Sequence, residues 1–279
     1  MIAGCYVFAT EWAPCGDLAG AVAKAPGPSE AAIRGVAAQI GSALEFMHSK
    51  SLAHRDLKLE NVLVFAPDLS RVKLADMGST RRTGSLVAPV QTWRPFLPPE
   101  ECGVLPKERY TCSVAGDTWQ LAILVLVALS GAPPWRSADI SDFDYCQFAR
   151  WQKRRTTKLP AKFKAYTPRF LRLLRRMLEP KLDKRAPISD VQKYVSDSWL
   201  VVSRGVPQGG LAALQQGEDG SDSLLYLNSR GDQSKRGLAK LLSSYGLETT
   251  VDRQEMTRRL CEWVLSCDTS DDGSVTESV

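Results

Sequence analysis

Apolar residues recur at helical spacing in one long stretch near the start of the chain. They follow one another every three or four positions, as on one face of an amphipathic helix. They are Ile33, Val36, Ile40, Leu44 and Met47. Ser29 precedes them as a suitable N-cap, so the sequence predicts a helix from Ser29 to about His48.

Three short apolar runs rich in β-branched and aromatic residues predict strands. They cover Cys5 to Trp12, Val62 to Phe65 and Val72 to Leu74. A turn around Pro67–Asp68 separates the last two runs, so we expect them to lie next to each other.

The middle of the chain is mainly helical by the same criterion. Helices are expected at about 116–130, 139–152, 167–178 and 187–196. The longest apolar run, Leu121–Leu129, lies in the first of these helices and is too short to span a bilayer. A long segment rich in Gly and Pro, Asp76–Glu100, precedes the helices and is expected to be a functional loop.

The composition changes after Trp199. Residues 205–223 are rich in Gly, Gln, Asp and Ser and are typical of a linker. Two amphipathic stretches, at about 235–245 and 252–265, follow before an acidic end.

The charge of the chain is unevenly placed. The 279 residues carry a formal net charge of +5, but residues 205–279 hold seven Lys or Arg and twelve Asp or Glu. The rest is therefore strongly basic, mostly between Lys153 and Arg185. A solvated basic face is the simpler interpretation, and a docking surface for acidic or phosphorylated partners is the alternative. Nucleic acid is not expected, because no aromatic residues interleave with the charge.

Cysteine and histidine usage argues against a metal centre built from these residues. The seven Cys are odd in number, scattered and without CxxC spacing, so neither a disulfide framework nor a zinc site is expected. The only two His are His48 and His54. No basic segment precedes the first apolar residues, so we expect no signal peptide and a cytoplasmic location.

The strongest chemical signal is HRDLKLEN, at His54–Asn61. Phosphoryl transfer needs an acceptor for the proton of the attacking hydroxyl, a cation near the transferred phosphate, and oxygen ligands for Mg²⁺. Asp56 can accept the proton, and Lys58 can face the phosphate. Asn61 offers the hard oxygen that Mg²⁺ prefers.

A further acid follows in the triplet Asp76, Met77 and Gly78. A carboxylate followed closely by glycine suits a metal ligand on a flexible turn. An Asp-x-Gly at this distance after HRDxKxxN is a specific combination. The sequence therefore predicts that Asn61 and Asp76 together hold Mg²⁺.

These motifs, in this order, resemble those of the eukaryotic protein kinases over residues 3–204. PPE, at Pro98–Glu100, stands where that family has Ala-Pro-Glu. The resemblance implies a buried ion pair between Glu100 and Arg185, the arginine in DKRAP. Lys58, two residues after the catalytic Asp, resembles serine/threonine kinases rather than tyrosine kinases.

The closer resemblance is to the SH3-binding-domain kinase family. The phrases YVFATEWAPCGDL and RVKLADMGSTRR, and the PPW after the buried helix, are similar to that group. The family name implies a partner with an SH3 domain, which binds Pro-rich segments. PxxP spacing occurs at Pro95 and Pro98, but these lie in the substrate loop, where a structural role is favoured.

The resemblance also implies structural and regulatory roles. Asp117, in GDTW, opens the buried helix of the large lobe. His54 and Met77 would stack as apolar supports beneath the metal-binding Asp76. Arg55 would face the activation loop and pair with a phosphate on one of its hydroxyls, or these hydroxyls stay unmodified. The hydroxyls are those of Ser79, Thr80, Thr83 and Ser85.

The ATP-binding residues are likewise implied by the resemblance. Backbone groups of Glu11 and Ala13 would hydrogen-bond adenine at the hinge, with Thr10 as gatekeeper. Leu63 would pack under the ring, and Asp17 would face the ribose. Ordinary packing within a strand also explains Thr10 and Leu63, and this role is compatible with nucleotide binding.

Two departures from the family pattern affect the prediction. The sequence contains no GxGxxG, and nothing before the hinge supplies the Lys and Glu that position the phosphates. We therefore expect an α+β kinase-like fold, with a mainly α-helical large lobe, short strands, and the small lobe essentially missing. Thr92 and Trp93 stand where the family has Gly and Thr, and that Thr normally braces Asp56 and Lys58.

Three segments are expected on these grounds. Residues 1–15 form the last small-lobe strand and the hinge. Residues 16–204 form the large lobe of a protein kinase. Residues 205–279 form a linker and a weakly helical acidic tail.

The predicted function is that of a serine/threonine protein kinase. It would use ATP and Mg²⁺ to phosphorylate protein hydroxyls, here as an N-terminally truncated chain. The alternative is a catalytically inactive half-kinase that acts as an interaction scaffold through its basic face and acidic tail. A small-molecule kinase is disfavoured, because the Pro-Pro-Glu loop serves protein substrates. Neither nucleic acid nor a membrane is an expected partner.

Overall fold

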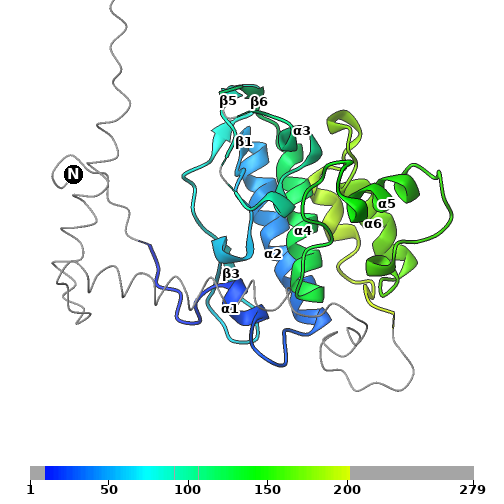
Figure 1. Cartoon of the computed structure of the whole chain (residues 1–279). Helices are drawn as coiled ribbons and strands as arrows, with labels where there is room; N and C mark the ends of the chain where they lie inside the picture. The colour runs from blue at the N-terminus through cyan, green and yellow to red at the C-terminus, as the bar shows by residue number, and fades with distance from the viewer. Residues whose placement is uncertain (1–9, 91, 106, 202–279) are drawn as a thin grey trace, which may run out of the picture. The chain divides into compact units, whose positions relative to one another are not determined.

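The computed structural model describes residues 10–90, 92–105 and 107–201. The chain divides into two compact units, Ala13–Asn228 and a unit that joins Met1–Trp12 to Ser229–Val279. The helices and strands in Figure 1 all belong to Ala13–Asn228. Of the predicted strand at Cys5–Trp12, the structure describes only residues 10–12, which form no strand. The segment 205–279 lies outside the described residues.

Two long helices form the centre of the unit Ala13–Asn228. α2 (Glu30–Ser49) and α4 (Ala115–Ser130) pack against each other and run side by side in Figure 1. The hydroxyl of Ser29 caps α2 by accepting a hydrogen bond from the Ala32 N–H at 3.2 Å. Nearly every residue of α4 is buried, as its continuous apolar sequence requires. Both helices confirm the prediction from the sequence.

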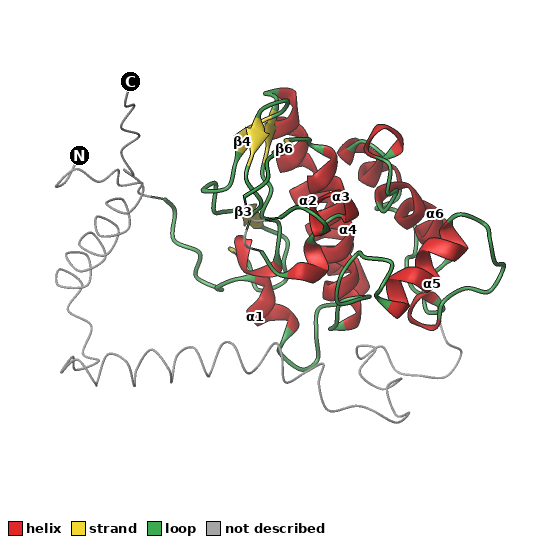
Figure 2. Cartoon of the chain, turned by 45° about the horizontal axis from the view of Figure 1, so that its top comes forward, coloured by secondary structure: helices red, strands yellow, loops and turns green. Residues whose placement is uncertain are grey.

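Two further helices, α5 (Phe143–Gln152) and α6 (Pro168–Met177), lie on one side of α4, and the short strands lie on the other (Figures 1 and 2). An aromatic cluster fills the core beside α5. The ring centroid of Phe148 lies 5.3 Å from that of Trp135 and 4.8 Å from that of Phe163. Such rings bury a large apolar area each, so this cluster is a major source of stability.

One predicted helix is wrong, and another is too long at its start. Residues 187–196 form only the 3₁₀ helix η5 (Ile188–Lys193), which packs on α2. Its buried residues Ile188 and Val191 are three positions apart, which matches the repeat of a 3₁₀ turn. α5 begins at Phe143 rather than near 139, because Asp142 caps it by accepting from the Tyr145 N–H at 3.0 Å.

Within the described residues, the strands form three antiparallel pairs. β1 (Leu52–Ala53) pairs with β4 (Arg81–Arg82), and β5 (Leu86–Val87) pairs with β6 (Tyr110–Thr111). β2 (Val62–Val64) pairs with β3 (Val72–Leu74), with Val62 opposite Leu74, so these two predicted strands form a hairpin.

Short helices connect these parts. They are α1 (Leu18–Val22), η1 (Leu59–Asn61), η2 (Arg94–Phe96), α3 (Pro99–Cys102), η3 (Ala161–Phe163) and η4 (Leu182–Lys184). The described fold is thus mainly helical with a few short strands, in agreement with the prediction. None of the helices among the described residues has both the length and the apolar character needed to cross a bilayer.

A pair of substitutions in α5 tests how the aromatic cluster supports the fold. Phe148 is fully buried, so Phe148→Ala should lower the free energy of unfolding by about 3–5 kcal/mol. Phe143, in the same helix, is 75% exposed, and Phe143→Ala should change it by less than about 0.5 kcal/mol. Urea denaturation followed by circular dichroism measures both. Equal losses for the two variants would contradict the placement of α5.

Candidate active site

Residues of α4 hold the backbone of His54–Asn61, the predicted catalytic loop. The carboxylate of Asp117 is fully buried and accepts hydrogen bonds from the N–H groups of His54, at 2.9 Å, and Arg55, at 2.8 Å. One turn further along α4, the Gln120 side chain accepts from the Leu57 N–H at 3.0 Å and donates to the Arg55 carbonyl at 3.1 Å. Helix residues three apart share one face, so Asp117 and Gln120 grip the loop together.

Sequence reasoning missed Gln120 and His48. His48 Nε2, at the end of α2, lies 2.8 Å from Asp117 Oδ2. The helical spacing of Gln120 after Asp117 was the available signal for Gln120. No comparable sequence signal links His48 to Asp117, because 69 positions separate them along the chain.

The structure brings Asp56, Lys58 and Asn61 together. Lys58 Nζ donates to Asp56 Oδ2 at 2.8 Å, and Asn61 Nδ2 lies 3.1 Å from the same oxygen. Asn61 Nδ2 also donates to the Asp56 carbonyl at 2.8 Å, which fixes the turn between them. The other carboxylate oxygen, Asp56 Oδ1, is buried and has no hydrogen-bond partner.

The surroundings of Asp56 favour its ionised form. Burial alone would raise the pKa of Asp56, but the hydrogen bond from Lys58, the nearby Thr92 hydroxyl and the Lys58 charge together lower it below its ordinary value. The Thr92 oxygen is buried and falls short of a regular hydrogen bond. It is nevertheless close enough to lower the pKa of Asp56. This is expected if Thr92, one residue before the family's position, replaces the threonine that normally braces Asp56 and Lys58.

Asp76 lies near Asn61 because of the β2–β3 hairpin. Asn61 precedes β2, Asp76 follows β3 by one residue, and the Ala75 N–H donates to the Asn61 carbonyl at 2.8 Å. His54 Nε2 lies 3.0 Å from the Ala75 carbonyl, so the buried His54 ring supports the residue before Asp76.

The donor chemistry at this end of the hairpin fits Mg²⁺. Asn61 donates through Nδ2, which leaves its amide oxygen available as a ligand. Asp76 is exposed, and its Oδ1 accepts a 3.2 Å hydrogen bond from the Gly78 N–H. Amide and carboxylate oxygens are the hard ligands that Mg²⁺ prefers.

The predicted packing of Met77 is wrong. Met77 is 48% exposed, so it is not the buried support beneath Asp76 that the resemblance implied. Asp76 adopts a left-handed backbone conformation with φ 61°, and the Thr80 N–H donates to the Met77 carbonyl at 3.0 Å. This tight turn directs Met77 outward. Gly78 sits inside the turn, where an added Cβ would lie 3.2 Å from Asp76 Oδ1.

Of the residues predicted to bind ATP, Asp17 and Leu63 lie beside each other. The two residues form an isolated β-bridge, and the neighbouring Cys15 N–H donates to the Val64 carbonyl at 3.2 Å. Asp17 also caps α1, with its Oδ1 accepting from the Gly20 N–H at 2.7 Å. Ala13 starts this unit, whereas Thr10 and Glu11 belong to the other unit, so their hinge contacts stay a prediction.

The Glu100–Arg185 pair links α3, where the long loop Asp76–Glu100 ends, to the helical core. Two nitrogens of the Arg185 guanidinium each lie 2.7 Å from one oxygen of the Glu100 carboxylate. The Arg185 side chain is fully buried, and the Glu100 side chain keeps 20% of its surface exposed. Arg185 also donates to the Glu179 and Ala115 carbonyls, at 2.7 and 3.0 Å.

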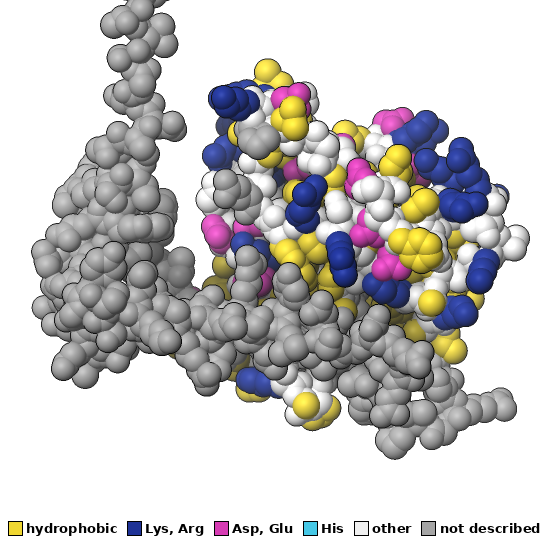
Figure 3. All heavy atoms as spheres, viewed as in Figure 1, with side chains coloured by type: hydrophobic (Ala, Val, Ile, Leu, Met, Phe, Trp, Pro, Cys, Tyr) yellow, Lys and Arg dark blue, Asp and Glu magenta, His cyan; other side chains and the backbone are white. Residues whose placement is uncertain are grey.

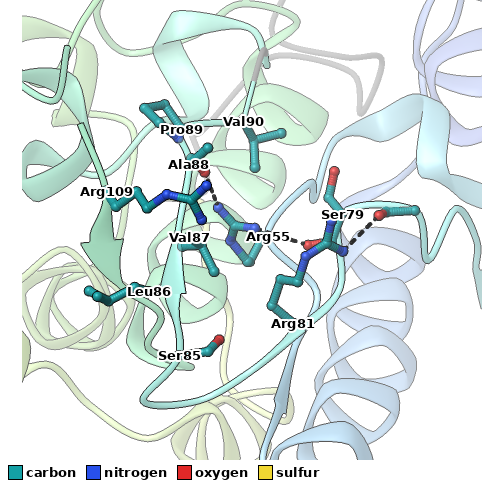
Figure 4. Close-up of a pocket in the computed structure, with 11 residues that line it drawn as sticks. Arg55, Ser79, Arg81, Ser85, Leu86, Val87, Ala88, Pro89, Val90 and Arg109 are labelled. Atoms are coloured by element: carbon teal, nitrogen blue, oxygen red, sulfur yellow. Dashed lines mark hydrogen bonds between the residues drawn. The ribbon is translucent and has the colours of Figure 1, made fainter. Parts of the chain in front are cut away.

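The Arg55 side chain lines a cavity of about 480 Å³ (Figure 4). Its guanidinium donates to the carbonyls of Ala88, at 2.7 Å, and Ser79, at 3.3 Å. Arg81 and Arg109 line the same cavity, so three cations surround it. Ser79 and Ser85, two of the four candidate hydroxyls, also line it.

Comparisons with known proteins agree with this geometry. The protein kinase domain family matches residues 4–200. Serine/threonine-protein kinase meng-po of Drosophila melanogaster is 40% identical over 277 residues, covering 97% of this chain and 60% of that protein. Serine/threonine-protein kinase SBK1 of Danio rerio is 37% identical over 196 residues, covering 70% of this chain and 51% of that protein. For serine/threonine-protein kinase SBK2 of Homo sapiens the identity is 34% over 197 residues, with 70% and 57% covered.

The fold, the site and these similarities define a protein kinase domain. The chain belongs to the protein kinase family, and within it to the serine/threonine kinases of the SH3-binding-domain group. It spans about half the length of the curated relatives it matches. We therefore treat the activity, substrates and partners of the whole protein as proposals.

The unequal exposure of Glu100 and Arg185 gives a directional prediction. Glu100→Ala strands a fully buried cation, so the free energy of unfolding should fall by about 3–5 kcal/mol. Arg185→Met leaves a carboxylate that water still reaches and should lower it by less. Denaturant unfolding measures both variants, with Glu45→Ala on the exposed face of α2 as the control. A larger loss for Arg185→Met than for Glu100→Ala would contradict this assignment.

Proposed function

We propose that this protein transfers the γ-phosphate of ATP to serine or threonine hydroxyls of protein substrates. The observation that carries the proposal is the split environment of the Asp56 carboxylate. Lys58 and Asn61 hold Oδ2, whereas Oδ1 is buried and unpartnered. Leaving a buried acceptor unpaired costs about 1–3 kcal/mol, and a substrate hydroxyl entering beside Thr92 would supply the missing donor.

Each residue of the cluster has a part in this proposal. Asp56, kept ionised by its lowered pKa, orients the hydroxyl and accepts its proton. Lys58 donates to Asp56 in the structure and lies two residues from it, so its ammonium can face the transferred phosphate. Asn61 and Asp76 would hold Mg²⁺, which when bound neutralises charge on the phosphates.

The nucleotide would lie beside residues 15–17, which pair with β2 on the side away from β3 through Cys15 and Asp17. Leu63 would pack under adenine, Asp17 would face the ribose, and Ala13 would offer backbone groups to the adenine edge. The β-bridge between Asp17 and Leu63 supports this arrangement, because it brings a polar and an apolar side chain to one place. The hinge roles of Thr10 and Glu11 stay predictions from the sequence.

Partners other than substrate have less support. Pro95 and Pro98 are both buried, which favours their structural role over binding by an SH3 domain. The SH3 partner and the cytoplasmic location stay predictions from the sequence.

One observation favours the alternative function as an interaction scaffold. Lys and Arg side chains gather over α5, α6 and the segments next to them (Figure 3). Those exposed between residues 153 and 184 are Lys153, Arg154, Arg155, Lys158, Lys162, Lys164, Arg169, Arg172, Arg176, Lys181 and Lys184. Such a surface attracts acidic partners without any catalysis. An activity assay separates this alternative from the kinase.

Asp56→Asn tests the catalytic proposal. The amide keeps the size of the side chain but cannot accept a proton, so kcat should fall about 10²–10⁴-fold. The KM for ATP should change little. The measurement is transfer of radiolabelled phosphate to a serine/threonine peptide library, by this chain and by the longest protein that its transcript encodes.

Asp183→Asn is the matched control, since Asp183 is exposed on η4. It should leave kcat unchanged. The kinase proposal would be overturned if the longest protein encoded by the transcript stayed inactive under conditions where a relative phosphorylates the library. That result would favour the scaffold. Full activity in Asp56→Asn would overturn the role of Asp56.

A further inference from the structure

We propose that Glu101, acting through the Tyr110 hydroxyl, is the internal anion that holds the Arg55 side chain and the loop segments bound to it. Glu101 and Tyr110 are thus positioning residues for the catalytic loop. The inference rests on the proposed function only for its effect on catalysis. The structural part stands on the contacts of Arg55 alone.

The three side chains form a continuous hydrogen-bonded chain. Arg55 Nη2 donates to the Tyr110 hydroxyl oxygen at 3.0 Å, and the Tyr110 hydroxyl donates to Glu101 Oε2 at 2.6 Å. The Arg55 guanidinium also lies over the Tyr110 ring, 5.5 Å from its centroid. The chain joins three elements that are distant in sequence: the catalytic loop, β6 and α3.

The burial of Arg55 explains why it needs the hydrogen bonds through Tyr110 to Glu101. Only 7% of Arg55 is exposed, and among the described residues its guanidinium contacts no carboxylate directly. A buried cation without a counter-charge is strongly unfavourable. Its direct partners are two carbonyls and the Tyr110 hydroxyl, and only the hydroxyl leads on to a carboxylate, that of Glu101.

Glu101 is suited to this task because its charge is poorly compensated elsewhere. Burial, together with the neighbouring Glu100 and Asp117 carboxylates, raises the pKa of Glu101 to about 7, while Tyr110 and Arg55 lower it. Burial and Glu101 also raise the pKa of Tyr110, so Tyr110 remains a proton donor. Glu101 also contributes to the raised pKa of the Cys112 thiol, of which burial is the main cause.

The hold on Arg55 extends to the loop between Asp76 and Pro89. Arg55 binds the Ser79 and Ala88 carbonyls, which lie near the two ends of that loop. An ionised Glu101 strengthens both hydrogen bonds of the chain, because a charged acceptor polarises the hydroxyl between it and Arg55. A protonated Glu101 leaves the Arg55 charge uncompensated and loosens the loop.

The sign of the effect on stability follows from the raised pKa. Between the ordinary carboxyl value of 4.5 and about 7, folded Glu101 holds a proton that the unfolded chain has lost. The folded state therefore loses stability as the pH rises through this window, and the loss ends above it. Tyr110→Phe removes a group that lowers the pKa of Glu101, so the window should extend to higher pH.

Amide hydrogen exchange of residues 79–90, measured by mass spectrometry on the full chain, tests the proposal. At pH 8, Glu101→Gln and Tyr110→Phe should each exchange about tenfold faster than the native chain. At pH 6, native Glu101 is protonated, so the difference between it and Glu101→Gln should largely vanish. Glu108→Gln, at an exposed neighbouring position, is the matched control and should behave as the native chain does at both pH values.

Equal exchange in the native chain and both variants at pH 8 would overturn the proposal. So would a difference for Glu101→Gln that is the same at pH 6 and pH 8, since a merely structural role does not depend on ionisation. If Glu101→Gln fails to fold, Tyr110→Phe, which keeps the ring, carries the test.

The kinetic arm separates this inference from the proposed function. The kcat of the native enzyme should rise between pH 6 and pH 8, and that of Glu101→Gln should stay flat, with the KM for ATP unchanged in both. Absence of all phosphotransfer would sink the proposed function alone, because the exchange experiment needs no catalysis.

Discussion

The buried carboxylate of Asp117 is the interaction on which the candidate active site depends. It accepts hydrogen bonds from two consecutive N–H groups of the catalytic loop, while His48 closes the remaining side. A fully buried carboxylate is tolerated only with such partners, so the loop and α4 stabilise each other. Among the described helices α4 has the most buried residues, so it gives the loop a well-packed support.

The hydrogen bonds from α4 allow the side chains of the consecutive residues Arg55 and Asp56 to have different partners. Arg55 has a left-handed backbone with φ 72°, which costs about 1–2 kcal/mol outside glycine. Hydrogen bonds to Asp117 and from Gln120 on its two peptide groups hold that conformation. As a result, Asp56 faces Lys58 and Asn61, while Arg55 faces Tyr110 and the cavity with three arginines. Chemistry and loop control therefore share one short segment.

Much of the fold and of the site could be predicted from local sequence. Periodicity located α2 and α6, because each buries an apolar face, and the continuous apolar run located α4, which is buried nearly all round. The HRDLKLEN motif predicted a cluster because its members are at most five residues apart, and a five-residue turn brings them together.

The contacts that could not be predicted join residues that are far apart in the sequence. The Tyr110–Glu101 relay and the His48–Asp117 contact involve polar residues whose partners no spacing reveals. The 3₁₀ segment at Ile188 shows the same limit, since its short apolar repeat fits two helix types. Met77 was misplaced because an apolar residue in a motif was assumed to be buried, whereas the turn at Asp76 faces it outward.

The most direct test of the account is hydrogen exchange of the His54 and Arg55 amides in Asp117→Asn, resolved by NMR. The substituted amide turns an N–H₂ group toward at least one of these two donors, so at least one hydrogen bond is lost. These two amides should then exchange at least tenfold faster, with the amides in the middle of α4 still protected. Unchanged protection of both His54 and Arg55 would contradict the claim that Asp117 holds the catalytic loop.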